Sequence, residues 1–304
     1  METNGSNNTC VFHDEYKFYI YVIIFSLVFV IGLIGNLIAL FVFVYLTPQR
    51  TALTVFLTNL AMSDLCFVLL LPLRIYYYTI KNWPFGDIFC RITYCIFYVN
   101  MYSSIFFLMG ISIFRYLAIV HPIRSRNFST PHRAIISCVV IWLFVILVSS
   151  PFLQLGEHQV GNATRCFEPH EKNFETMKIL NDLALIVGLF VPFMIIIFCY
   201  ISIINVLQRR KKNVVLRQRT LRMIAITLVV FGLCFIPYHI QRTLYIYISS
   251  YHPTDCELRL TILDPFIYFF LSKNFRNLFC HVLHKSVFFK NGDFLATCTL
   301  RLAL

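Results

Sequence analysis

Four polar side chains interrupt long apolar stretches of this 304-residue chain. Asn36 lies in "GLIGNLIAL", Asp64 in "NLAMSDL", Arg115 in "SIFRYLAIVHP" and Asp264 in "CELRLTILDPFIYFF". Ionisable groups are costly inside a bilayer, so those that are retained mark functional positions. Because four separate apolar segments each carry one polar residue, we expect a shared, hydrated cluster rather than four unrelated lipid-facing residues.

A second group of residues combines arginines with phenol rings. Arg74 lies in "LPLRIYYYTIKNW" and Arg242 in "FGLCFIPYHIQR", each about two helical turns below the predicted outer surface. An unpaired guanidinium at that depth is costly, and no carboxylate is close to either arginine in the sequence. We therefore expect these arginines to bind an anionic ligand. The alternative is a carboxylate contributed by another part of the chain.

The phenols follow a helical spacing. Tyr94, Tyr98 and Tyr102 recur every four residues and therefore share one face of a helix. Interfacial tyrosine belts are common in membrane helices, and residues 76–78 fit such a belt. Tyr98 and Tyr102 lie about two to three turns below Cys90, which is too deep for a belt.

The enzymatic interpretation of the same residues is a catalytic pair of Asp64 and Asp264. No activated nucleophile and no metal-ligand spacing accompanies the two carboxylates in the sequence. We therefore predict that the chain is not an enzyme.

The composition identifies the elements that must position these residues. Hydrophobic residues make up 59% of the chain and charged residues 13%, so a soluble domain would expose large apolar patches. A membrane helix needs roughly 20 apolar residues to cross a core about 30 Å thick. Continuous apolar runs, which exclude a β-barrel, occur at residues 18–46, 52–80, 88–120, 132–154, 179–207 and 220–249, with a shorter seventh run at 258–271. The predicted fold is an all-α, integral membrane seven-helix bundle with a truncated seventh helix.

The distribution of charge predicts the orientation. With the N-terminus outside, the 26 Lys and Arg residues divide into 17 on the cytoplasmic side and 9 on the extracellular side, as the positive-inside pattern requires. Residues 208–222, "QRRKKNVVLRQRTLR", contribute seven of them. Nucleic-acid binding is the alternative explanation of such a basic run, and the neighbouring membrane spans disfavour it. We predict a multi-pass plasma-membrane protein.

Glycosylation sequons agree with this orientation. Three of them fall outside, at Asn4, Asn7 and Asn162, and are predicted to be glycosylated. A fourth, at Asn127, falls inside, where it should stay unmodified.

Of the eleven cysteines, four fall on the oxidising outer side, and four cysteines allow three pairings. A bridge from Cys90 to Cys166 would fix the loop between the fourth and fifth spans over the bundle. A bridge from Cys10 to Cys256 would tie the N-terminus to the loop before the seventh run. We predict these two bridges.

Three regions follow from these features. Residues 1–17 form an extracellular N-terminus, residues 18–271 the bundle, and residues 272–304 an amphipathic helix with a cytoplasmic tail. Within the sixth span, Pro237 cannot donate a backbone hydrogen bond and should bend the helix. In the tail, Cys280 is either a palmitoylation site or a free thiol.

Motifs in every span resemble those of the rhodopsin-like G-protein-coupled receptors. They are "GN" at 35–36, "NLAMSD" at 59–64, Arg115-Tyr116, Trp142, Pro192 with Tyr200, "FGLCFIP" and "DPFIY". Within that superfamily, "LPLR", "YVNMYSSIFFL", "SSPF", "TRCFEP" and "PYHIQRT" are most similar to the cysteinyl leukotriene receptors. Purinergic nucleotide receptors and the oxoglutarate receptor are similar to a lesser degree.

The resemblance implies a role for each matching residue. A receptor of this kind senses an extracellular anionic lipid, here a cysteinyl leukotriene, and activates heterotrimeric G proteins; a nucleotide or a dicarboxylate is the alternative ligand. The implied ligand-binding residues are Arg74, Tyr98, Tyr102, Tyr238, His239 and Arg242. The implied switch facing the G protein comprises Arg115, Tyr116, Tyr200, Asp264, Pro265 and Tyr268. No cofactor is implied beyond an allosteric sodium ion, whose pocket would be formed by Asp64, Asn100 and Asp264.

Two of the departures from the family pattern bear on whether the chain signals. Phe114 stands where an acidic residue usually precedes the switch arginine, so the usual ion pair cannot form. The last helix is also short: residues 258–271 span about 21 Å, against the roughly 30 Å that a bilayer requires. A splice variant or a gap in the gene model would produce this shortening. The competing interpretations are therefore a non-signalling membrane protein or dimerisation partner, and a transporter or channel. The absence of internal repeats and the small number of ionisable residues along a path disfavour the last.

Overall fold

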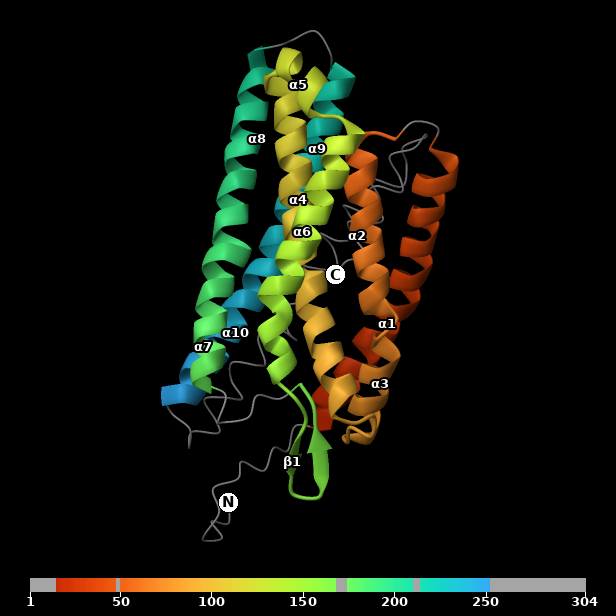
Figure 1. Ribbon diagram of the computed structural model, residues 1–304, viewed down its shortest axis with the longest axis vertical. Coiled ribbons are helices and arrows are strands. Elements are labelled where there is room, and N and C mark those ends of the chain that lie inside the picture. Colours follow the sequence, from red (N-terminus) through yellow and green to blue (C-terminus); the bar gives the residue numbers. More distant parts are fainter. Residues whose placement is uncertain (1–14, 48–49, 168–173, 210–213, 252–304) are drawn as a thin grey trace.

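The computed structural model describes residues 15–47, 50–167, 174–209 and 214–251, and long helices dominate them (Figure 1). The first part contains α1 (Glu15–Phe41) with the π-helical segment η1 (Val42–Leu46), α2 (Ala52–Val68), α3 (Leu71–Ile80), α4 (Asp87–Val120) and the short α5 (Pro122–Phe128). The second part contains α6 (Pro131–Ser149) with the 3-10 segment η2 (Ser150–Gln154), α7 (Phe174–Leu183), π-helical η4 (Ala184–Phe190), α8 (Val191–Arg209), α9 (Val214–Val230), π-helical η5 (Phe231–Phe235) and α10 (Ile236–Tyr251).

These elements join into six helices that are long and apolar enough to cross a membrane. Their bounds are Phe18–Leu46, Ala52–Ile80, Asp87–Val120, Pro131–Gln154, Glu175–Arg209 and Thr220–Ile248. The six predicted spans are thus confirmed to within four residues at each end. The predicted seventh helix at 258–271 and the amphipathic helix beyond it lie outside the described residues.

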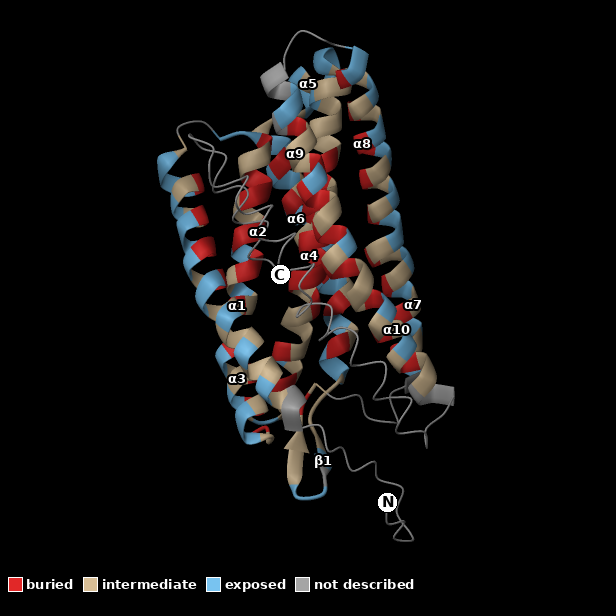
Figure 2. Cartoon of the chain, turned by 180° about the vertical axis from the view of Figure 1, so that it is seen from behind, coloured by how far each residue is buried: buried red, intermediate tan, exposed pale blue. Residues whose placement is uncertain are grey.

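The longest helix, α4, lies at the centre of the bundle and packs against α2, α6 and α8. Buried residues face this interior, whereas α1 and the outer faces of the other helices are largely exposed (Figure 2). The Trp142 indole of α6 donates a 3.0 Å hydrogen bond to the Asn59 side chain of α2, and its ring lies 5.6 Å from the ring of Phe107 on α4. One residue therefore joins three helices through the core.

Several helices are interrupted near the middle of the bundle. The segment η5 lies directly before α10, whose second residue is Pro237. Since Pro237 lacks a backbone donor and a π-helical turn departs from the regular hydrogen-bond ladder, the sixth span changes its winding where the sequence predicted a bend. In the fifth span, η4 brings Gly188 so close to Tyr102 that a Cβ would lie 2.6 Å from the phenol ring.

A two-stranded hairpin covers one end of the bundle, which the sequence analysis did not predict. Strands β1 (His158–Val160) and β2 (Ala163–Arg165) pair antiparallel, with Gln159 opposite Thr164. The turn between them contains Gly161 at φ 60°, a left-handed conformation that favours glycine. The Trp83 amide donates a 2.9 Å hydrogen bond to the Thr164 carbonyl, which attaches the hairpin to the loop before α4.

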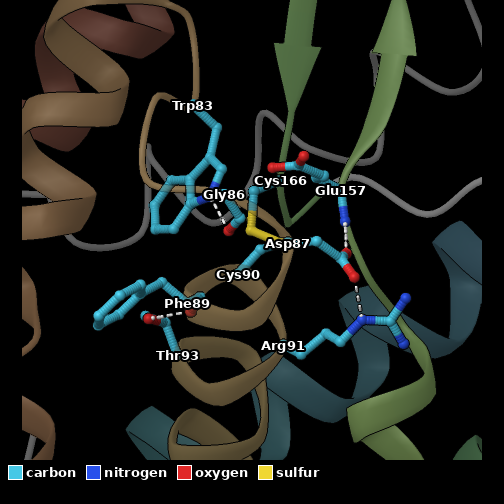
Figure 3. Close-up of a disulfide and its surroundings, with 9 residues drawn as sticks. All are labelled: Trp83, Gly86, Asp87, Phe89, Cys90, Arg91, Thr93, Glu157 and Cys166. Carbon is cyan, nitrogen blue, oxygen red and sulfur yellow. Dashed lines mark hydrogen bonds and ion pairs between the residues drawn. A yellow bond between two sulfur atoms is a disulfide. The ribbon is translucent and has the colours of Figure 1, made fainter.

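A disulfide attaches the loop that carries the hairpin covalently to α4 (Figure 3). Cys90 and Cys166 are bridged with their Cα atoms 5.9 Å apart, so this predicted pairing is confirmed; Cys10 and Cys256 lie outside the described residues. Beside the bridge, the Asp87 carboxylate accepts from Arg91 Nε at 2.6 Å and from the Glu157 amide at 3.0 Å. The disulfide and the hydrogen bond from Glu157 together fix the loop on the end of α4, where the Asp87–Arg91 ion pair lies within the helix.

Substitution of Gly110 should test the close packing at the centre of the bundle. A Cβ at Gly110 would lie 2.6 Å from the ring of Phe56, which is fully buried beside Phe107 and Phe114. Gly110→Ala should therefore destabilise the protein by about 1–3 kcal/mol through overpacking, visible as a lower melting temperature in detergent. Gly232→Ala is the matched control because no atom lies within 4 Å of its Cβ position. Equal melting temperatures for the Gly110→Ala and Gly232→Ala variants would contradict this close packing.

Removing the bridge should destabilise the covered end. We expect Cys166→Ser to lower the melting temperature in detergent, since a disulfide typically contributes about 2–4 kcal/mol. Cys66→Ser, at an exposed free thiol, serves as control and should leave the melting temperature unchanged. A bridge that contributes nothing would give the same value for both variants.

Candidate functional site

Arg74 is buried near the covered end of the bundle. Helix α3 buries Leu71, Arg74 and Tyr77, which recur every three residues. The guanidinium carbon lies 4.2 Å from the ring centroid of Phe167 and 4.8 Å from that of Phe97. The side chain is 7% exposed, and its Nε has no hydrogen-bond partner among the described residues. Its charge thus lies against aromatic faces.

Arg242 has a similar environment on α10. Its guanidinium carbon lies 4.6 Å from the ring centroid of Tyr98 and 5.3 Å from that of Phe152. It is 9% exposed, and neither terminal nitrogen has a hydrogen-bond partner among the described residues. The nearby Tyr102 hydroxyl also lacks one there. Several donors in this region therefore remain available to a ligand.

The two arginines belong to one site. The rings of Phe97 and Tyr98, consecutive on α4, lie 5.3 Å apart, and Arg74 contacts the first while Arg242 contacts the second. The phenol of Tyr238 lies within electrostatic range of both guanidinium groups. The adjacent rings of Phe97 and Tyr98 thus connect two cations that come from different spans.

His239 completes the set of predicted ligand residues. It is 0% exposed, and neither ring nitrogen has a hydrogen-bond partner among the described residues. Its ring centroid lies 6.0 Å from that of Tyr102. The structure therefore brings all six predicted ligand residues together: Arg74, Tyr98, Tyr102, Tyr238, His239 and Arg242.

Phe167 covers this site, and the sequence analysis did not select it. The residue directly follows the bridged Cys166 and has a left-handed φ of 72°. Its ring stacks on Tyr94 with centroids 6.2 Å apart and contacts Arg74. The available signal was its position beside the disulfide. Phe97 and Phe152 were also missed, because isolated phenylalanines in an apolar run carry no distinguishing pattern.

An apolar pocket adjoins the cationic site. It lies between α4, α6 and η4, where Tyr102 and Phe152 line both the pocket and the surroundings of Arg242. Its other walls include Phe106, Phe144, Leu180 and Gly188. The site therefore places apolar walls directly beside the surroundings of Arg242.

A polar cluster occupies the middle of the bundle. The Asn100 amide donates to Asp64 Oδ1 at 3.0 Å and to Ser63 at 3.2 Å, and the Ser63 and Ser103 hydroxyls lie 2.6 Å apart. Asp64 is 1% exposed, and its second carboxylate oxygen has no partner among the described residues. Asn36 instead donates to the Gly32 carbonyl of its own helix, and Asp264 lies outside the described residues. Two of the three predicted sodium-pocket residues are thus in contact.

The predicted switch residues lie at the opposite end from the hairpin. Arg115 Nη2 donates to the Met223 sulfur at 3.1 Å, which joins α4 to α9. The Ser112 hydroxyl donates to the Tyr200 hydroxyl at 2.8 Å, which joins α4 to α8. Tyr116 contacts His121 at 3.1 Å. Pro265 and Tyr268 lie outside the described residues, as Asp264 does.

Phe114 occupies the position where an acidic neighbour of Arg115 was expected. Its ring packs on the ring of Phe56 with centroids 5.1 Å apart and joins the core of the bundle. The departure from the family pattern therefore replaces an ion pair with an apolar contact.

Comparison with known proteins agrees with this architecture. The model of the seven-transmembrane receptor (rhodopsin) family matches residues 35–280. Cysteinyl leukotriene receptor 1 of Mus musculus is 39% identical, with 91% of this chain and 85% of the relative covered. Lysophosphatidic acid receptor 6 of Homo sapiens is 35% identical, with 91% and 87% covered. Cysteinyl leukotriene receptor 2 of Homo sapiens is 35% identical, with 94% and 88% covered. The chain belongs to the rhodopsin family of seven-transmembrane receptors, which is a family of receptors and not of enzymes.

Proposed function

We propose that the chain is a plasma-membrane receptor that senses an extracellular anionic lipid, a cysteinyl leukotriene, and activates heterotrimeric G proteins. The observation that carries this proposal is the pair of buried guanidinium groups of Arg74 and Arg242, which have no ion-pair partner among the described residues. Burial of such groups is favourable only when an anion compensates their lost hydration. A bound anion supplies that compensation.

The surroundings of the two cations favour a lipid over a small anion. Cysteinyl leukotrienes combine a fatty chain with a peptide that carries carboxylates. The carboxylates would contact Arg74 and Arg242, and the fatty chain would enter the apolar pocket beside Tyr102 and Phe152. A nucleotide or a dicarboxylate, the alternative ligands, would leave that pocket unused.

A lysophospholipid with one phosphate head group is a second candidate ligand. Lysophosphatidic acid receptor 6 of Gallus gallus is 36% identical over 88% of this chain. Its phosphate could also bind both arginines; we place it second because cysteinyl leukotriene receptor 1 of Mus musculus is the more similar of these two relatives.

The proposed orientation puts the N-terminus and the hairpin outside the cell. The Cys90–Cys166 bridge lies at the hairpin end, and disulfides persist in oxidising compartments. Arg115 lies toward the opposite end, which would therefore face the cytoplasm and the G protein.

Signalling would follow from a population shift between two arrangements of the bundle. The π-helical segment η5 and Pro237 lie between Arg242 and the Met223 contact of Arg115. They offer a pivot through which an agonist at Arg242 would alter the contacts of Arg115. Tyr200 and Tyr116 are the proposed partners in that change.

We also propose a sodium ion as an allosteric ligand at the polar cluster. The free carboxylate oxygen of Asp64 and the nearby Ser63 and Asn100 oxygens suit a hard cation. Bound there, the ion would compensate the buried charge of Asp64.

Expression in cells tests signalling itself. A cysteinyl leukotriene should release calcium or activate G proteins in cells that express the chain, whereas cells expressing Arg115→Ala should bind the ligand without responding. Retention of the chain inside the cell, with no response, would contradict the receptor function and support the non-signalling alternative. A response to lysophosphatidic acid alone would reassign the ligand.

Variants of the two arginines test the ligand site. Arg74→Ala and Arg242→Ala should each weaken agonist potency by roughly ten- to a hundredfold, because each removes charge-assisted hydrogen bonds to the ligand. Arg50→Ala, at an exposed position before α2, is the control and should leave potency unchanged. Unchanged potency in both site variants would refute this binding site.

A further inference from the structure

Two pairs of polar side chains join α7 to α10 beside the cationic site, and nothing described so far uses them. Asn181 donates a 3.0 Å hydrogen bond to the Thr243 hydroxyl. The Tyr247 hydroxyl lies 2.9 Å and 3.1 Å from the two Asp182 carboxylate oxygens, to which it donates. Asn181 is 0% exposed. We refer to Asn181, Asp182, Thr243 and Tyr247 together as the α7–α10 clamp.

The spacing of these residues makes the clamp an interhelical contact of defined geometry. On α10, His239, Thr243 and Tyr247 recur every four residues and therefore form one stripe. On α7, Asn181 and Asp182 are consecutive, and each bonds to a different residue of that stripe. Two bonds one helical turn apart on α10 restrict both the position and the rotation of that helix.

Rotation of α10 determines where Arg242 points. Arg242 directly precedes Thr243, about 100° around the helix axis, and its guanidinium lies over the Tyr98 ring of α4. Within the stripe, Thr243 and Tyr247 face α7, whereas the arginine faces α4. If α10 rotated so that the hydrogen bond between Asn181 and Thr243 broke, the Arg242 guanidinium would therefore also move away from the ring of Tyr98.

The backbone around the clamp makes such a side-chain contact necessary. The sixth span reaches α10 through π-helical η5, and Pro237 follows without a backbone donor. On the other side, α7 continues into π-helical η4. Since both outer helices are joined to their inner halves by irregular turns, the regular backbone ladder alone does not set their rotation.

We infer that Asn181 and Asp182 are positioning residues for the anion site: through Thr243 and Tyr247 they hold α10 at the rotation that directs Arg242 toward α4. The choice of ligand in this inference rests on the proposed function. The positioning of Arg242 by the clamp does not. Lys178 supports the same contact, because its ammonium lies 5.3 Å from the Tyr247 ring.

The first test compares a charged and a neutral form of one probe. Tyr247→Phe and Thr243→Val remove one hydroxyl each and keep the shape of the side chain. Both should weaken binding of a cysteinyl leukotriene with free carboxylates about three- to tenfold, the effect of one hydrogen bond, and should leave its methyl ester unaffected. In an Arg242→Gln background the same changes should have no further effect on the free acid.

Matched variants separate positioning from general packing. Ile240→Val, on the exposed face of α10, should change neither form of the probe. Asp182→Asn retains an acceptor for Tyr247 and should bind like the parent, whereas Asp182→Leu should behave like Tyr247→Phe. Equal losses for acid and ester, or additive losses in the Arg242→Gln background, would overturn the inference.

The second test needs no ligand. In Arg242→Cys, a negatively charged methanethiosulfonate applied from outside should label Cys at this position, with the parent chain as background. Adding Tyr247→Phe should slow labelling at least threefold, because the thiol turns away from the aqueous site. An unchanged labelling rate would contradict the proposed role of the clamp. If the parent binds neither acid nor ester, the proposed ligand is wrong, and the labelling rates alone decide the role of the clamp.

Discussion

Two buried guanidinium groups impose the strongest constraint on this molecule. Arg74 and Arg242 lie on different spans, are almost fully buried, and face aromatic rings with no carboxylate bound to them in the described part of the chain. Cation–π contacts offset only part of the lost hydration of an arginine. The bundle must therefore hold two charges in place without neutralising them. The disulfide, the hairpin and Phe167 all act on the end of the bundle where this occurs.

The remaining elements connect that site to the opposite end. The α7–α10 clamp acts on the outer half of the sixth span, and the Arg115–Met223 contact acts on its inner half. Between them lie η5 and Pro237, where the helix is least regular. This irregular turn is the point at which the two halves of the span can change their relative orientation. The polar cluster at Asp64 joins α2 to α4.

Much of the fold followed from the sequence because membrane burial leaves a simple signal. The ends of all six described spans were predicted to within four residues. The position of ionisable residues deep within apolar runs identified Arg74, Arg242 and Asp64 before any contact was known. The Cys90–Cys166 pairing followed from topology. Features that depend on tertiary contacts did not follow: the hairpin, the three π-helical segments, and Phe167 as a cover over Arg74. Asp182 was overlooked although it is an ionisable residue within a span, because its phenol partner Tyr247 is 65 residues away. The shortened seventh helix stays a prediction, since it lies outside the described residues.

The stability of the purified protein in the presence of ligand measures the compensation of the two cations most directly. A lipid that carries carboxylates should raise the melting temperature in detergent, because a ligand that binds only the folded state stabilises it by roughly 3 kcal/mol at a hundredfold excess over Kd. The neutral ester should raise it far less. A melting temperature that no anionic lipid changes, at concentrations where the detergent-solubilised chain stays folded, would contradict the account of Arg74 and Arg242 as an anion site.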